Sequence, residues 1–292
     1  MNAVQPLRDP VAAEAATHAG APGWRAELEL GFERRDGRTV LVRNRHLGPL
    51  RVQKPLYPEG GAVCHAIVLH PPAGIVGGDS LQVTVRVGEG AQALLTTPGA
   101  GKWYRSAGAE ASLDQRIAVA GGALCEWLPQ ETLVFDGALG EQCTEVELAP
   151  DARFIGSEML CFGRTASGER FAQGRFVTRT RIRRGGQTLW LERGRVNGGS
   201  LLLDSPVGLA GHPVAGTLWL VGQGVDEALR DALRAILPPT GLGAVTLLPG
   251  VLVARWLGPA CEPGREWFAR LWAAARPALA GREAVTPRIW NT

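Results

Sequence analysis

The chain has 292 residues, of which 45% are hydrophobic and 20% charged, and its formal net charge at pH 7 is +3. That length and apolar content suffice for one large domain or two ordinary ones. The small net charge, without one long basic block, argues against a nucleic-acid-binding protein. No stretch is long and apolar enough to predict a membrane span, and the first residues lack the apolar core of a signal peptide.

The first 22 residues differ in composition from the rest. They are rich in alanine, include Pro6, Pro10 and Pro22, and hold almost no large apolar side chains. Such a segment has little apolar surface to bury, so we expect residues 1–22 to be a disordered leader. We expect residues 23–292 to form a single β-rich domain.

Strand patterns begin soon after this segment. Residues 28–32 alternate apolar and polar side chains, which predicts a half-buried strand. Asp36-Gly37 is typical of a two-residue hairpin turn, and residues 39–43 fit the returning strand. The apolar run at residues 64–69 predicts a buried strand.

A loop rich in proline and glycine follows, with the sequence HPPAGIVGGD at residues 70–79. Its prolines exclude helix, and its glycines permit positive φ or close approach of another surface. Alternation at residues 81–87 predicts the next strand. The loop is either functional or a wide turn whose Asp79 caps backbone N–H groups. The residues singled out are His70, Pro71, Pro72, Gly74, Gly77 and Gly78.

A weak internal repeat decides the predicted architecture. Each copy reads as strand, short turn, small residue and strand, with a period of roughly 30 residues, which is typical of stacked or wound repeats. We therefore expect a mainly β fold, with a wound, β-helix-like sheet in which loops of successive coils lie along one side. An ordinary meander with glycine-rich turns is the alternative. The copies cover residues 85–96, 117–128, 146–157 and 180–191.

Acidic residues follow several of these strands. Glu131, Glu158 and Glu192 each come just after an apolar strand, and Asp79 lies beside glycines. Carboxylates along an interior strip can bind a divalent cation weakly or form an acid–base pair. Capping and surface solvation is the alternative for each of them.

The last third changes character. Residues 226–237 have the apolar spacing of an amphipathic helix and end at two prolines. Residues 266–276, rich in tryptophan and alanine, predict a second helix that ends at Pro277. Between them, residues 244–248 and 251–256 read as strands. We expect Trp290 to pack against the domain in spite of its place near the end of the chain.

Most familiar catalytic motifs are missing. The Gly99-Ala100-Gly101-Lys102 segment lacks the glycine spacing and the Ser or Thr after lysine that a phosphate-binding loop requires. His65 and His70 would face opposite sides of a strand, which disfavours a shared metal.

Basic residues and cysteines give weaker signals. Arginines at alternate positions within residues 175–184 predict one charged strand face, either solvated or at a partner-facing edge. The five cysteines include no C-x-x-C pair, which predicts reduced thiols and a cytoplasmic location.

Several motifs, taken together, resemble the urease accessory protein UreD family (also called UreH). The resemblance runs from about Gly23 to the end of the chain, with the motifs in matching order. They are the loop at residues 70–79, LLTTP at 94–98, WLPQE at 127–131, SEMLCFGR at 157–164 and PRIW at 287–290.

The resemblance implies a wound β fold with two helices in the C-terminal third and no catalysis. It implies a complex with UreF and the GTPase UreG on apo-urease, and help with nickel insertion. No tightly bound cofactor is expected; Ni²⁺ would pass transiently along an internal channel. By matching motifs, the channel candidates are Asp79, Thr96, Thr97, Glu158 and Glu192.

Two alternatives remain from the sequence. One is a structural adaptor with no metal passage. The other is a wound-β carbohydrate-active enzyme using a carboxylate pair such as Glu131 and Asp136, which predicts secretion and exposed aromatic platforms.

Overall fold

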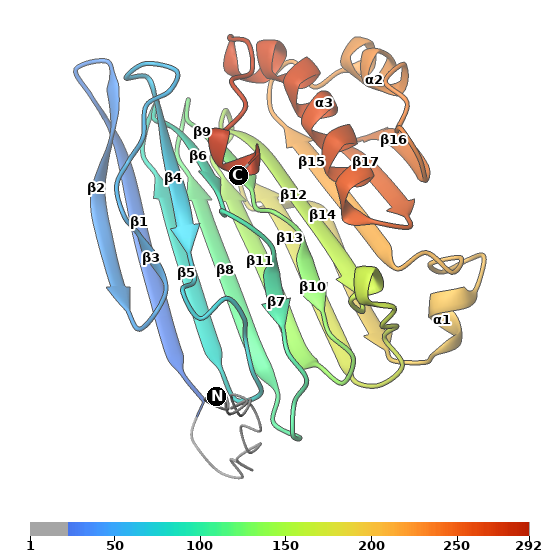
Figure 1. Cartoon of the computed structure of the whole chain (residues 1–292). Coiled ribbons are helices and arrows are strands. Elements are labelled where there is room, and N and C mark those ends of the chain that lie inside the picture. The colour runs from blue at the N-terminus through green and yellow to red at the C-terminus, as the bar shows by residue number, and fades with distance from the viewer. Residues whose placement is uncertain (1–22, 292) are drawn as a thin grey trace, which may run out of the picture.

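The computed structural model describes residues 23–291, so the expected leader at residues 1–22 lies outside the described residues. Two β-sheets face each other, and the chain winds from one to the other in successive coils (Figure 1). The two longer helices of the last third pack against the outer face of the second sheet. The mainly β, β-helix-like fold is thus confirmed.

The first sheet has seven strands, and its central part is parallel. A hairpin closes each edge: β1–β2 at one side and β13–β14 at the other. In spatial order the strands are β14 (Gln187–Asn197), β13 (Arg175–Arg184), β11 (Leu139–Leu148), β8 (Ala111–Val119), β5 (Ser80–Val87), β1 (Arg25–Arg35) and β2 (Arg38–Leu47).

The second sheet has ten strands, with a parallel run from β4 to β12 and antiparallel strands beyond it. Two short strands extend it: β10 (Thr132–Val134) pairs with the last residues of β12, and β7 (Gly101–Trp103) pairs with β10. The others, in spatial order, are β16 (Leu242–Leu248), β17 (Val251–Gly258), β15 (Val214–Val221), β12 (Arg153–Phe162), β9 (Leu124–Leu128), β6 (Gln92–Thr96), β4 (Val63–Leu69) and β3 (Arg51–Val52).

Three of the four predicted repeats are coils of this winding. Their first strands align through Val85, Ile117 and Val146, and each then crosses to the second sheet. The prediction of a fourth coil was wrong, because the chain turns back after β13 and forms β14 beside it in the first sheet. Gly185 and Gly186 both have positive φ, 53° and 84°, which suits a two-residue hairpin turn.

The predicted basic strand is β13, but it is not an edge. Its Arg179, Arg181 and Arg183 each form an ion pair with a glutamate of neighbouring β11, at 2.9–3.1 Å. These three arginines of β13 are therefore matched by acidic residues of β11 and do not form an unpaired basic strip.

Both expected C-terminal helices are present, as α2 (Glu227–Arg234) and α3 (Cys261–Ala280). The expected end at Pro277 was wrong: helix α3 continues to Ala280, although proline has no N–H to donate, and Leu279 and Ala280 are buried in this last turn. The structure adds a short helix, α1 (Leu201–Asp204), and two 3₁₀ turns, η1 (Thr165–Ser167) and η2 (Arg288–Asn291). Within residues 23–291, none of the helices is long and apolar enough to cross a bilayer.

Apolar side chains form two cores on opposite faces of the second sheet. Along β12, Phe154 and Leu160 face the first sheet, whereas Ile155 and Cys161 face α3. Trp290 packs edge-on against Trp272 of α3, as predicted, with ring centroids 5.4 Å apart. All five cysteines are free.

Candidate functional site

The proline- and glycine-rich loop is a tightly bonded turn at one end of the winding. The Asp79 carboxylate accepts hydrogen bonds from the backbone N–H of Trp24 at 2.8 Å and of Val76 at 2.9 Å. Asp79 therefore caps the turn and joins it to the first described strand. Among the histidines, His70 lines the interior between the sheets, whereas His65 faces Glu59 and α3, so the two do point to opposite sides.

The glycines of this loop allow close packing. A Cβ at Gly77 would lie 2.3 Å from Ser106 Oγ and 2.7 Å from the carbonyl oxygen of Ala109. We expect Gly77→Ala to lower the free energy of unfolding by about 1–3 kcal/mol, because the loop must shift to accept the methyl group. Urea denaturation measures this, with Gly99→Ala as control, since a Cβ at Gly99 meets no atom within 4 Å. Equal effects of both changes would contradict the packing account.

The second sheet is interrupted along one line. Strand β6 ends at Thr96 and β7 starts at Gly101; β9 ends at Leu128 and β10 starts at Thr132. In Figure 1, β7 and β10 continue the paths of β6 and β9 toward the other end of the sheet. Two short loops therefore lie side by side at the break, joined by a 3.0 Å hydrogen bond from the Gln130 N–H to Thr97 Oγ1.

A cavity of about 580 Å³ lies between the sheets at this break. Most of its wall is apolar, but a strip of amide, hydroxyl and carboxyl groups crosses it. Polar residues from both sheets form the strip: Gln115, Gln142, Thr144 and Thr180 from the first, and Thr97, Gln130, Ser157 and Glu158 from the second.

Glu158 is the acidic group of this cavity. Its Oε2 accepts a 2.8 Å hydrogen bond from Nε2 of Gln142 on the facing sheet. Burial raises the pKa of Glu158 to about 7, the nearby Glu192 carboxylate adds to the rise, and Gln142 and Arg255 oppose it. The carboxyl group is thus poised to exchange a proton, or another cation, near neutral pH.

This raised pKa has a measurable consequence for stability. The pKa of Glu158 is about 7 in the folded chain, whereas an ordinary glutamate has a pKa of 4.5. The unfolded chain therefore loses this proton at lower pH than the folded chain, and the folded chain loses stability as pH rises from about 4.5 to about 7. We expect Glu158→Gln to gain melting temperature relative to the wild type between about pH 5 and about pH 8. Glu192→Gln should move the midpoint of this change to lower pH, since it removes a neighbouring negative charge. A pH-independent difference between Glu158→Gln and the wild type would contradict the assignment.

Of the other channel candidates, only Thr97 lines this cavity. Glu192 acts electrostatically on Glu158 while forming a 2.6 Å ion pair with Arg255. Thr96 faces away, donating to the Leu128 carbonyl oxygen at 2.6 Å and accepting from Trp290 Nε1 at 2.8 Å. Asp79, bound to its own turn, does not line the cavity.

The carboxylate pair considered for a carbohydrate-active enzyme does not share a site. Asp136 accepts hydrogen bonds from Arg105 and from two backbone N–H groups of residues 172 and 173. Glu131 instead pairs with Arg265 of α3. Each carboxylate has its own partners, so the geometry gives no support to that alternative.

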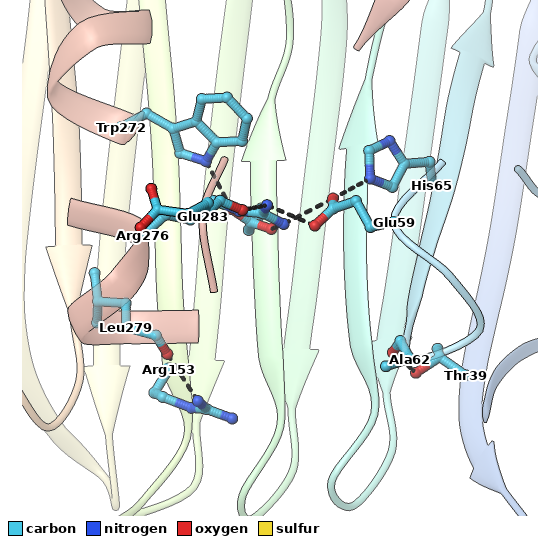
Figure 2. A network of polar contacts seen from close by, with 10 residues as sticks. Thr39, Glu59, Ala62, His65, Arg153, Trp272, Arg276, Leu279 and Glu283 are labelled. Atoms are coloured by element: carbon cyan, nitrogen blue, oxygen red, sulfur yellow. Dashed lines mark hydrogen bonds and ion pairs between the residues drawn. The ribbon is translucent and has the colours of Figure 1, made fainter. Parts of the chain in front are cut away.

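A buried ionic cluster was missed from the sequence. Arg276 of α3 donates all five of its N–H groups: two to Glu126, two to Glu59, and one to the Glu283 carbonyl oxygen, at 2.6–3.0 Å. His65 and Trp272 bond to the same carboxylates. Figure 2 shows Arg276 and Trp272 of α3 converging with Glu59 and His65 between α3 and the second sheet. The cluster fixes the C-terminal helix over the coils.

Around Glu158 the donors of the cavity are amide and hydroxyl groups, and His70 and Lys102 also line its wall. Carboxylate, amide and hydroxyl oxygens bind divalent cations without holding them as a cysteine or histidine cage would. Within residues 23–291, no three His, Cys, Asp or Glu side chains are arranged to hold one metal ion. The cavity can therefore offer an ion a single carboxylate, several neutral oxygens and the imidazole of His70.

Comparison with known proteins gives one consistent result. A sequence model described as "UreD urease accessory protein" matches residues 25–291. A protein from Azoarcus sp. (strain BH72) named "Urease accessory protein UreD" is 65% identical over the full length of both chains. Proteins of the same name from Dechloromonas aromatica and Pseudomonas aeruginosa are 55% and 53% identical, each over 93% of this chain and 96% of their own.

Proposed function

Since this chain belongs to the UreD family of urease accessory proteins, we propose that it serves urease maturation as a non-catalytic scaffold for nickel insertion. In this proposal it acts in the cytoplasm in a complex with UreF and UreG on apo-urease. The observation that carries the proposal is the match to relatives named as urease accessory proteins over nearly the whole chain.

Nickel is the cargo in this account, not a resident cofactor. A passing ion needs ligands that bind and release it, and it needs shelter from competing chelators. Glu158 and the neutral oxygens around it meet the first need, and the position of the cavity between two sheets meets the second. Thr97 lies on the same wall.

The GTP hydrolysed during maturation is assigned in this proposal to UreG. The segment at residues 99–102, which resembles a phosphate-binding loop in composition, forms part of the sheet break and the start of β7. A phosphate-binding loop precedes a helix, so this segment supports the assignment of GTP to UreG.

The test is a clean deletion in the source organism, grown at ordinary nickel concentration. We expect inactive, nickel-poor urease in the deletion strain and recovery with the wild-type chain. A tagged copy should co-purify with urease subunits and UreF. Full urease activity in the deletion strain would reject the proposal.

A further inference from the structure

A second cavity, of about 560 Å³, lies on the other face of the second sheet, beneath α3 and η2. It shares wall residues with the cavity between the sheets, namely Pro129, Gln130, Ser157 and Met159. All four lie at the sheet break. Strand β12 pairs with β9 up to Gly156 and with β10 from Leu160 onward, so residues 157–159 lack a partner on that side. The two cavities therefore adjoin where β12 lacks a neighbouring strand on one side.

One side chain of α3 lies across this junction. Arg265 donates through Nη1 to Gln130 Oε1 at 2.6 Å, and its Nε lies 3.3 Å from Oε2 of Glu131. Arg265 Nε and Glu131 Oε2 are both buried, and neither atom has a hydrogen bond of good geometry. The ion pair is thus held less firmly than that of Arg276, whose five donors are all used.

The surroundings of Arg265 favour cations. Glu262 and Glu266, one turn apart on α3, line the same outer cavity as Glu131. With Arg265 bound to Glu131, a positive charge lies at the junction and opposes the entry of another cation. With Arg265 turned away, Glu131 and the Gln130 amide oxygen are free to accept a cation.

We propose that the break between β9 and β10 is a mouth of the cavity between the sheets, and that Arg265 closes it by occupying Glu131 in place of a divalent cation. This inference rests on the proposed function, because it gives the nickel path an opening on the α3 side. Arg265 acts as a positioning residue that is displaced when an ion passes.

The test measures access to the shared wall with the full chain and without nickel. Ser157→Cys places a thiol on that wall, and a cationic methanethiosulfonate reagent labels it at a rate followed by peptide mass spectrometry. We expect Arg265→Gln to speed the labelling of Cys at this position by about fivefold, the factor that corresponds to losing one partly exposed ion pair. Arg265→Lys should keep the slow rate.

Arg270→Gln is the matched control, because it removes a charge from an exposed position of α3 whose contact is the Leu237 carbonyl oxygen. If Arg265→Gln does not fold, Glu131→Gln frees the same arginine and should also speed labelling. Unchanged rates in both variants, or an equal rise with Arg270→Gln, would overturn the proposal. Because the labelling reaction needs neither nickel nor urease, this result is independent of whether nickel is delivered.

Discussion

Replacing Arg276 with methionine is expected to lower the free energy of unfolding by about 3–5 kcal/mol, which is the usual cost of removing one partner from a buried ion pair. The Glu59 and Glu126 side chains are only 3% and 1% exposed, and Arg276 is fully buried. Without the guanidinium, two carboxylates remain in a site that water does not reach. The methionine side chain fills much of the volume, so the loss measures charge more than packing.

Thermal and urea denaturation measure this effect, and the melting temperature should fall by about 10 °C for a chain of this size. Arg270→Met, on the exposed side of the same helix, is the control and should change the free energy of unfolding by less than about 0.5 kcal/mol. A loss for Arg276→Met as small as that of the control would show that the cluster does not hold α3 in place.

The second large effect is expected at the cavity. Replacing Glu158 with glutamine keeps the volume and the contact with Gln142 but removes the carboxylate, so we expect urease activation in cells to fall by about tenfold or more. Complex formation should not change, because Glu158 faces the interior. Urease activity and co-purification of urease subunits measure the two separately.

Glu147→Gln is the matched control, since Glu147 lies on the outer face of the first sheet in an ion pair with Arg183. It should leave activation intact. Normal activation with Glu158→Gln would favour the structural adaptor over a protein that conducts nickel, and loss of the complex would mean that Glu158 has a structural role.

Local patterns predicted much of the fold. The alternation before and after Asp36-Gly37 predicted the β1–β2 hairpin, and the strand–turn–strand repeat predicted three coils. The fourth copy has the same local pattern, but two consecutive glycines with positive φ turn its chain back within one sheet. Which sheet a strand joins depends on turn geometry that a hydrophobic pattern does not encode.

The candidate site was predicted less completely. Glu158 and Thr97 were selected by resemblance and do line one cavity, whereas Asp79 and Thr96 are bonded elsewhere. In sequence, a short polar residue at the end of a strand or beside a turn fits a structural hydrogen bond and a channel wall equally well. Only the positions of Trp24 and Trp290, far away in the chain, distinguish the two.

The buried cluster had one sequence signal. Arg276 comes four residues after Trp272 and so lies on the apolar face of α3, where a charged side chain requires a buried partner. Its partners Glu59 and Glu126 are 217 and 150 residues distant in sequence. No local pattern joins such positions, and the winding that brings them together had to be known first.

The central claim is that nickel reaches urease through the cavity beside Glu158. The most direct measurement is the nickel content of urease purified from the deletion strain carrying either wild-type, Glu158→Gln or Glu147→Gln chain. The account predicts full occupancy with wild type and Glu147→Gln, and nickel-poor urease with Glu158→Gln although the complex forms. Equal nickel content with all three chains would contradict it.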